Sequence, residues 1–398
     1  MLQDVLFKNY DEEYTVKLLQ ELISIPSETP HGDVVAIIAR LEAEMKSLGF
    51  DTKVVSKNPS KPNLIAEYNK QGKGPALVLY AHADCAAIEG DAHLWQTNPY
   101  GGDIIDGVIY GNGAADAKSG IAQLIAASKA IIDSGLPLDG RLLFIASADG
   151  EIGDLEGAKW MYEEGLIPKA DFGINADASC LRIQYTFRGR TFWKFTTKGI
   201  VCHSNSPQNG VNAVSKMIKV MAAIEQGPFA FTSHPTMPDP TRTWTRVDGG
   251  VKHNSLPGRC EAILDLRLIP GMTIAKAGEE MEQILDKLRA EDPRLDVKME
   301  LMEFGAREVI AFPSDCRIVE EANKAFQEVT GQAPDNTSGP GSAGCIMYFG
   351  ELGIPSIFFG PANLETAHQP DECCSIDKLH IATKVTALTV ANIIGKQS

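Results

Sequence analysis

An α/β protein with two domains is the fold class that the sequence predicts. The chain has 398 residues, which is more than one hydrophobic core usually organises. Short apolar runs alternate with helical patterns in the first third and return near the end, as in a largely parallel sheet with flanking helices. The segment between them has longer predicted strands and two predicted helices. We place the sheet domain at residues 1–183 and 301–398, and an inserted α/β sandwich at 184–300.

The elements of the first domain follow from hydrophobic periodicity. Apolar residues recur every three or four positions in segments 12–24, 33–48 and 118–134, which predicts amphipathic or buried helices. Short apolar runs that predict buried strands lie at residues 63–66, 76–80, 142–146, 172–175 and 355–359. Because the last run is far from the others, we expect the sheet to be built from both ends of the chain.

The inserted domain shows longer strands and two helices. The predicted order is strand, helix, strand, helix, strand, at residues 191–198, 210–224, 259–268, 274–290 and 295–304. Apolar residues of the first of these helices have helical spacing, which indicates packing rather than ligand binding.

Composition and charge limit the partners. Apolar residues make up 44% and charged residues 22% of the chain, as in an ordinary folded protein. A net charge of −15 disfavours nucleic acid and anionic membranes and favours metal cations and small molecules. The start lacks the pattern of a signal peptide and no apolar stretch is long enough to span a bilayer, so we expect a cytoplasmic protein. The 8 cysteines are dispersed without a Cys-x-x-Cys pair, which indicates neither a disulfide framework nor a thiolate zinc site.

Imidazole and carboxylate side chains follow the predicted strands. In an open α/β sheet, ligands gather at the carboxyl ends of the strands. Taken singly, an aspartate after a strand is more often a turn former or a helix cap. Together, this donor set suits zinc, cobalt or manganese, and a shared carboxylate would hold two ions about 3.5 Å apart. The candidates are His82, Asp84, Asp116, Glu151, Asp177 and His368.

These residues lie in motifs that occur in a fixed order. The motifs are His82-Ala83-Asp84, residues 111–118 (GNGAADAK), residues 149–153 (DGEIG), Asp177, residues 199–207 around His203, residues 254–257 (NSLP) and residues 367–372 (AHQPDE). In this order the chain resembles the family of co-catalytic di-zinc hydrolases that includes aminoacylase, acetylornithine deacetylase, succinyl-diaminopimelate desuccinylase and the glutamate-releasing carboxypeptidase.

The resemblance implies a role for each metal-site residue. It makes Asp116 the bridge between two divalent ions, which we expect to be zinc, with cobalt or manganese as alternatives. Glu151 and His368 would bind one ion, and His82 and Asp177 the other. Asp84 would orient His82.

The resemblance also implies roles outside the metal site. The inserted domain would be a dimerisation lid, with His203 reaching the partner subunit's active site to stabilise the oxyanion, so we expect a homodimer. Asn254 and Arg267 match lid positions that face the substrate, although Asn254 could be a turn residue and Arg267 a solvated strand residue. His203 could likewise be a polar loop residue. A functional role for His253, which lies beside Asn254, remains an open possibility.

Gly150 departs from the family pattern. In the resembling enzymes, the residue before the Glu151 ligand is a glutamate that takes a proton from the metal-bound water and delivers it to the leaving nitrogen. Glycine cannot do this, and a positioned general base typically contributes about 10²–10⁴-fold to the rate. We expect binding to survive and ordinary amide cleavage to suffer, least for activated substrates. Gly150 could also serve the backbone, as a turn residue with positive φ.

A second departure lies in the glycine-rich stretch 338–344, which contains Ser342. In relatives this turn helps to hold the carboxylate end of the substrate, and Ala343 replaces an aspartate found in many of them. We retain Ser342 as a substrate-binding candidate because the backbone of this turn could still donate hydrogen bonds.

Three functional hypotheses follow from the sequence. The first, which we favour, is a dinuclear metallohydrolase that cleaves an amide-like C–N bond in a small carboxylate-bearing molecule, such as an N-acyl amino acid or a dipeptide. Another group would then supply the base: Asp154, Glu156, Glu365, Cys85 or a group of the substrate. The second is a catalytically silent relative that binds a metal or an amino-acid derivative. The third is a deliberately inactivated form of such an enzyme.

Overall fold

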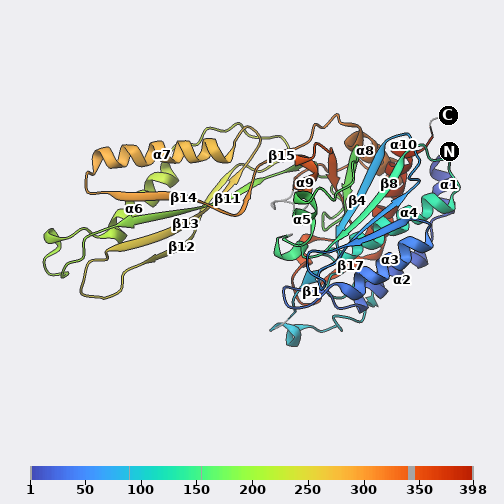
Figure 1. Cartoon of the computed structure of the whole chain (residues 1–398), viewed down its shortest axis with the longest axis horizontal. Coiled ribbons are helices and arrows are strands. Elements are labelled where there is room, and N and C mark those ends of the chain that lie inside the picture. Colours follow the sequence, from blue (N-terminus) through green and yellow to red (C-terminus); the bar gives the residue numbers. More distant parts are fainter. Residues whose placement is uncertain (1, 89, 154, 339–345, 397–398) are drawn as a thin grey trace. The chain divides into compact units, whose positions relative to one another are not determined.

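The computed structural model describes residues 2–88, 90–153, 155–338 and 346–396, with the backbone alone at 303 and 304 (Figure 1). The chain forms two compact units. Unit 1 holds the described residues within Met1–Tyr185, Phe312–Thr337 and Ala343–Ser398, and unit 2 those within Thr186–Ala311 and Ser338–Ser342. The return to unit 1 comes later than residue 301, because strand β14 (Asp296–Arg307) and the short strand β15 (Ile310–Ala311) still belong to unit 2.

Unit 1 is built on a six-stranded sheet with the order β16-β9-β4-β8-β3-β2. The four strands from β16 to β8 are parallel, whereas β3 pairs antiparallel with both β8 and β2. The strands are β2 (Asp51–Val55), β3 (Asn63–Tyr68), β4 (Ala76–His82), β8 (Arg141–Ser147), β9 (Phe172–Asn175) and β16 (Ser356–Phe358). The sequence did not predict β2, because this edge strand is largely exposed and lacks an apolar run.

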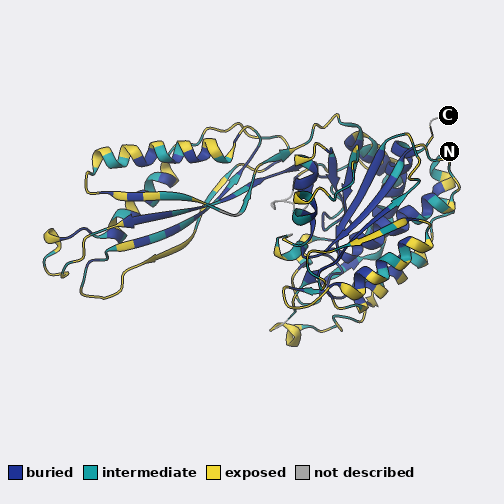
Figure 2. Ribbon diagram, viewed as in Figure 1, coloured by how far each residue is buried: buried dark blue, intermediate teal, exposed yellow. Residues whose placement is uncertain are grey.

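Helices cover both faces of this sheet (Figure 2). Strand β4 shows why: Leu77 and Leu79 pack in a cluster with residues of α4 and α10, whereas Val78 and Tyr80 pack in a second cluster with residues of α5 and α9. The helices are α1 (Leu2–Lys8), α2 (Glu12–Ser24), α3 (Val35–Ser47), α4 (Lys118–Asp133), α5 (Ala158–Glu163), α8 (Arg317–Thr330), α9 (Ile346–Glu351) and α10 (Ile376–Ile394).

Short elements surround the carboxyl edge of the sheet. Strands β1 and β5 pair parallel, and β6, β7 and β17 form a small antiparallel sheet. They are β1 (Glu28–Thr29), β5 (Cys85–Ala86), β6 (Asp103–Ile105), β7 (Val108–Tyr110) and β17 (Cys373–Ser375), with the 3₁₀ turns η1 (Ala92–Leu94), η2 (Gly150–Ile152) and η4 (Leu364–Thr366). Among the helices described, none combines the length and the apolar character needed to cross a membrane.

Unit 2 has a four-stranded antiparallel sheet with the order β12-β13-β11-β14. Helices α6 and α7 pack on one face, against side chains such as Trp193, Phe195 and Leu264. The elements are β10 (Thr186–Phe187), β11 (Gly189–Lys198), η3 (Pro207–Asn209), α6 (Ala213–Gln226), β12 (Thr241–Gly249), β13 (Arg259–Leu268) and α7 (Ile274–Glu291), followed by β14 and β15. The sequence missed β12, an edge strand with mostly exposed side chains and no apolar run.

Candidate dinuclear metal site

The carboxyl ends of the parallel strands bring the predicted ligands together. His82 is the last residue of β4, and its register partner Ser147 ends β8, four residues before Glu151. Asp177 follows β9 by two residues. Neighbouring parallel strands end at one edge of a sheet, so side chains from separate parts of the chain meet there.

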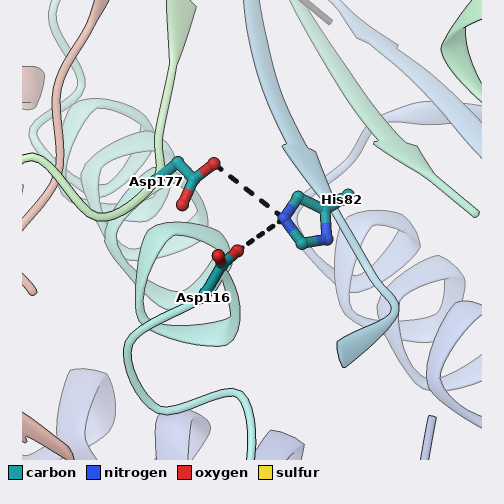
Figure 3. A group of neighbouring side chains, drawn as sticks. All are labelled: His82, Asp116 and Asp177. Atoms are coloured by element: carbon teal, nitrogen blue, oxygen red, sulfur yellow. Dashed lines mark hydrogen bonds and ion pairs between the residues drawn. The ribbon is translucent and has the colours of Figure 1, made fainter. Parts of the chain in front are cut away.

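Asp116 faces two histidines with its two carboxylate oxygens. Its Oδ1 lies 2.8 Å from His82 Nε2, and its Oδ2 lies 3.4 Å from His368 Nε2. Asp177 Oδ2 is 3.9 Å from the same His82 nitrogen (Figure 3). Glu151 Oε2 is 2.8 Å from His368 Nε2. The side chains therefore form two groups that share Asp116: His82, Asp116 and Asp177, and Asp116, Glu151 and His368.

The electrostatics of these groups fit a cation. Burial and the charge of Asp116 raise the pKa of Asp177 and of Glu151. Hydrogen bonds to Asp116 and Glu151 raise the pKa of His368 to about 11. Within the described part of the chain, the buried Glu151 Oε1 finds no hydrogen-bond donor. Histidine protons therefore balance the carboxylates, and divalent ions would replace them, so metal affinity should rise with pH through the neutral range.

Asp84 holds both His82 and the loop that carries Glu151. Its Oδ1 lies 3.1 Å from His82 Nδ1 and accepts a hydrogen bond from Gly150 N (2.8 Å). Its Oδ2 accepts from Thr29 Oγ1 (2.6 Å) and from Glu151 N (3.2 Å). These contacts turn His82 Nε2 toward Asp116, which is the orientation that a metal ligand needs.

Gly150 is packed against the ring of His82. A Cβ atom at position 150 would lie 2.5 Å from His82 Cγ and 2.6 Å from His82 Cβ, closer than real side chains approach. A positive φ does not explain the glycine at 150, because the residues of this turn with positive φ are Asp149, with φ of 55°, and Gly153, with φ of 109°. The glycine instead permits the loop to approach His82 and to donate its N–H to Asp84.

The structure constrains the candidates for the missing base. Burial raises the pKa of Cys85 to about 11, so its thiol is neutral near pH 7. Glu156 accepts from Asn58 Nδ2 at 3.3 Å, and Glu365 is exposed and accepts from Asn363 Nδ2 at 3.3 Å. Asp154 lies outside the described residues.

Glu372 is a site residue to which the sequence analysis assigned no role. This carboxylate is 2% exposed and accepts hydrogen bonds from the backbone of Gly113 (3.0 Å), Ala115 (2.8 Å) and Asp116 (2.9 Å). It thus holds the loop that presents Asp116. Its place in the motif of residues 367–372 was visible, but its partners come from a segment more than 250 residues away.

The predicted lid residues lie in unit 2. His203 and Asn254 are exposed and occupy adjacent loops, joined by a hydrogen bond from Ser204 N to Asn254 O (3.0 Å). Arg267 lies on β13, where Asp265 accepts two hydrogen bonds from its guanidinium, at 2.8 and 2.9 Å. Ser342 and Ala343 lie outside the described residues.

The fold and the shared carboxylate place this chain among metal-dependent hydrolases. Residues 78–392 match the model of Peptidase family M20/M25/M40, and the chain belongs to this family. It is 27% identical over 384 residues to the uncharacterized protein YgeY of Escherichia coli (92% of this chain, 90% of that one). It is 25% identical over 400 residues to succinyl-diaminopimelate desuccinylase 2 of a Ruegeria species (96% and 95%). The solved structure of aminopeptidase PepT from Bacillus cereus matches with a TM-score of 0.79 and 20% identity (97% and 99%).

Proposed function

We propose that this protein is a dinuclear metallohydrolase that cleaves an amide-like C–N bond in a small carboxylate-bearing molecule, such as an N-acyl amino acid or a dipeptide. The observation that carries the proposal is Asp116, whose two oxygens each face a different histidine-containing group. Membership of the M20 family and a relative named as a desuccinylase support the reaction class. The dispersed cysteines of the sequence favour a reducing, cytoplasmic setting.

Each site residue has a defined task in this proposal. Asp116 would bridge the two ions, with His82 and Asp177 on one side and Glu151 and His368 on the other. Zinc suits these donors best, and cobalt or manganese would also be accepted. When bound, such ions polarise a substrate carbonyl and lower the pKa of water to about 7. Asp84 keeps the His82 ring in place, and Glu372 keeps the Asp116 loop in place.

Because of Gly150, the group that transfers the proton during hydrolysis is not identified. With no carboxylate at this position, the proton must pass through another group of the protein or through the substrate. We therefore propose that substrates whose leaving group needs little protonation are turned over fastest.

The close approach of Gly150 to His82 also bears on the alternatives. A silent metal-binding relative remains the second candidate, because the same packing leaves no room for the family's base at this position.

Hydrolysis by the metal-loaded protein tests the proposal. We expect zinc- or cobalt-loaded protein to hydrolyse members of a panel of N-acyl amino acids, dipeptides and activated amides. His368→Ala, with one ligand removed, should bind less metal and lose the activity. Product formation followed by chromatography, with bound metal counted in each sample, would decide. Two bound ions with no turnover of any member would favour the silent relative.

We also propose a homodimer formed through unit 2, with His203 stabilising the oxyanion in the partner's site. The edge strand β12 and helix α6 carry exposed apolar side chains, including Val247 (52% exposed) and Ile218 (62%). Sedimentation equilibrium should show a dimer, and Val247→Lys with Ile218→Lys should shift it toward monomer. Leu94→Lys, at an exposed apolar residue of unit 1, is the control. A monomeric wild-type protein would contradict this proposal.

A further inference from the structure

A thiol and an amine from distant parts of the chain meet in unit 1. Cys180 lies in the loop that follows β9, and Lys378 lies in the first turn of α10. Lys378 Nζ donates to Cys180 Sγ at 3.0 Å. Both residues are partly exposed, so small solutes can reach them. Among the cysteines that the structure describes, Cys180 is the one whose sulfur accepts a hydrogen bond from a lysine.

The backbone of the Cys180 loop is held by the segment of residues 360–362. Cys180 N donates to Ala362 O at 2.7 Å, and Leu181 N donates to Gly360 O at 2.9 Å. Cys180 and Leu181 both have left-handed backbone conformations, with φ of 54° and 65°, which cost free energy in residues other than glycine. The surrounding contacts outweigh this cost, so the fold itself keeps the thiol beside Lys378.

The Lys378 amine has no competing ion pair in the part of the chain that the structure describes. Lys384, on the same helix, donates instead to a carboxylate oxygen of Glu12 at 2.8 Å. Cysteines that peroxide oxidises are typically accessible and adjacent to a cation, because the cation favours the thiolate that attacks the peroxide. The pair therefore combines a thiol of this kind with a nitrogen that can react with the oxidised sulfur.

We propose that Cys180 and Lys378 form an oxidation site that hydrogen peroxide converts into a covalent sulfur–nitrogen link. The sulfur first attacks one oxygen of the peroxide and the O–O bond breaks, so sulfur is oxidised to a sulfenic acid and the peroxide is reduced to water. The Lys378 amine, once it has lost a proton to solvent, then attacks this sulfur. The S–O bond breaks, an S–N bond forms, and the hydroxyl leaves as water with a proton from the amine. Two equivalents of a thiol would restore both side chains and leave as a disulfide.

The link would join the loop of a proposed metal ligand to α10. Asp177 lies three residues before Cys180, and Ser179 between them is fixed by hydrogen bonds in both directions with Gly360, at 2.9 and 3.1 Å. Oxidation would thus act on the segment that positions Asp177. The formation of the link needs neither a metal nor a substrate, so this proposal does not depend on the hydrolase proposal.

Peptide mapping of the full-length protein after treatment with hydrogen peroxide tests this site. We expect the peptides that contain Cys180 and Lys378 to be joined, with a mass about 2 Da below the sum of the two, because one hydrogen is lost from each side chain. Trypsin should no longer cleave after Lys378 in the linked product. A thiol reductant should separate the peptides and restore the cleavage.

Lys378→Arg and Lys384→Arg are a matched pair on α10. Lys378→Arg keeps a cation beside the thiol, but its guanidinium stays protonated and does not attack sulfur. Cys180 should then stop at the sulfenic acid, which dimedone labels, and the link should be lost. Lys384→Arg should form the link as the wild type does.

Cys316 provides the comparison for the thiol. It is partly exposed like Cys180, but burial raises the pKa of its thiol. Cys180 should therefore be oxidised faster than Cys316, and Cys316→Ser should still form the link. A wild-type Cys180 that is oxidised no faster than Cys316 would overturn the proposal. So would a sulfenic acid at Cys180 that forms no link in the wild type, or a link that persists in Lys378→Arg.

Discussion

Asp116→Asn is expected to abolish binding at both metal positions and, with it, hydrolysis. Asparagine keeps one side-chain oxygen, as an amide carbonyl, but replaces the other with an amide NH₂ group. This group donates hydrogen bonds and cannot bind a metal. Because the two oxygens of Asp116 face different histidines, one change affects both groups. We expect each affinity to fall by more than about 100-fold, beyond the loss typical of a residue that only orients a ligand.

Comparing Asp177→Asn with Asp116→Asn distinguishes a ligand of one metal position from a ligand that bridges both. Asp177 belongs to one group only, so this variant should lose one ion and keep the other. Asp51→Asn, at an exposed carboxylate on edge strand β2, should keep both. Metal counting by mass spectrometry and circular dichroism on each variant would distinguish lost ligation from lost folding. If Asp116→Asn retained either ion at wild-type affinity, Asp116 would not be the bridge.

Gly150→Ala is expected to weaken metal binding although it removes no ligand. The added Cβ would lie 2.5 Å from His82 Cγ, so the ring or the loop must move. Overpacking of this kind typically costs about 1–3 kcal/mol of stability. Displacing a ligand through its surroundings typically costs about 10–100-fold in metal affinity. Competition with a chelating dye, together with a melting curve, would measure both effects.

Two further variants make this expectation specific. Gly153→Ala, in the same loop, adds a Cβ with nothing within 4 Å but at a φ of 109°, so it should lower stability and leave metal affinity unchanged. Gly150→Glu should fail to raise the hydrolysis rate, because the same clash precedes any benefit from the carboxylate. A gain of orders of magnitude in Gly150→Glu would show that the loop readily accepts a side chain, and this explanation of Gly150 would be wrong.

Much of the fold could be predicted from local patterns in the sequence. Residues 12–24 form helix α2 as predicted, where Asp11 caps the first turn by accepting from Tyr14 N at 2.9 Å. The parallel strands were visible as short apolar runs, and their ends located the ligand candidates. Strands β2 and β12 were missed because an exposed edge strand carries little hydrophobic signal.

Features that depend on distant contacts could not be read from the sequence. The approach of Gly150 to His82 joins residues 68 positions apart, so the sequence suggested only turn geometry. The pairing of Arg267 with Asp265 is local to one strand, but its neighbours Arg190 and Arg307 depend on strand register. Register follows from the packing of the whole sheet and not from any one segment.

The position of Asp84 implies that the two metal positions are thermodynamically linked. One of its oxygens contacts His82, a proposed ligand of one position, and the other accepts from the backbone of Glu151, a proposed ligand of the second. An ion that orders His82 also orders Asp84 and, through it, Glu151, so the second ion meets a ligand that is already preorganised. Such positive cooperativity would lower the fraction of singly loaded wild-type protein, so we expect both positions to fill over a narrower range of metal concentration than two independent sites would.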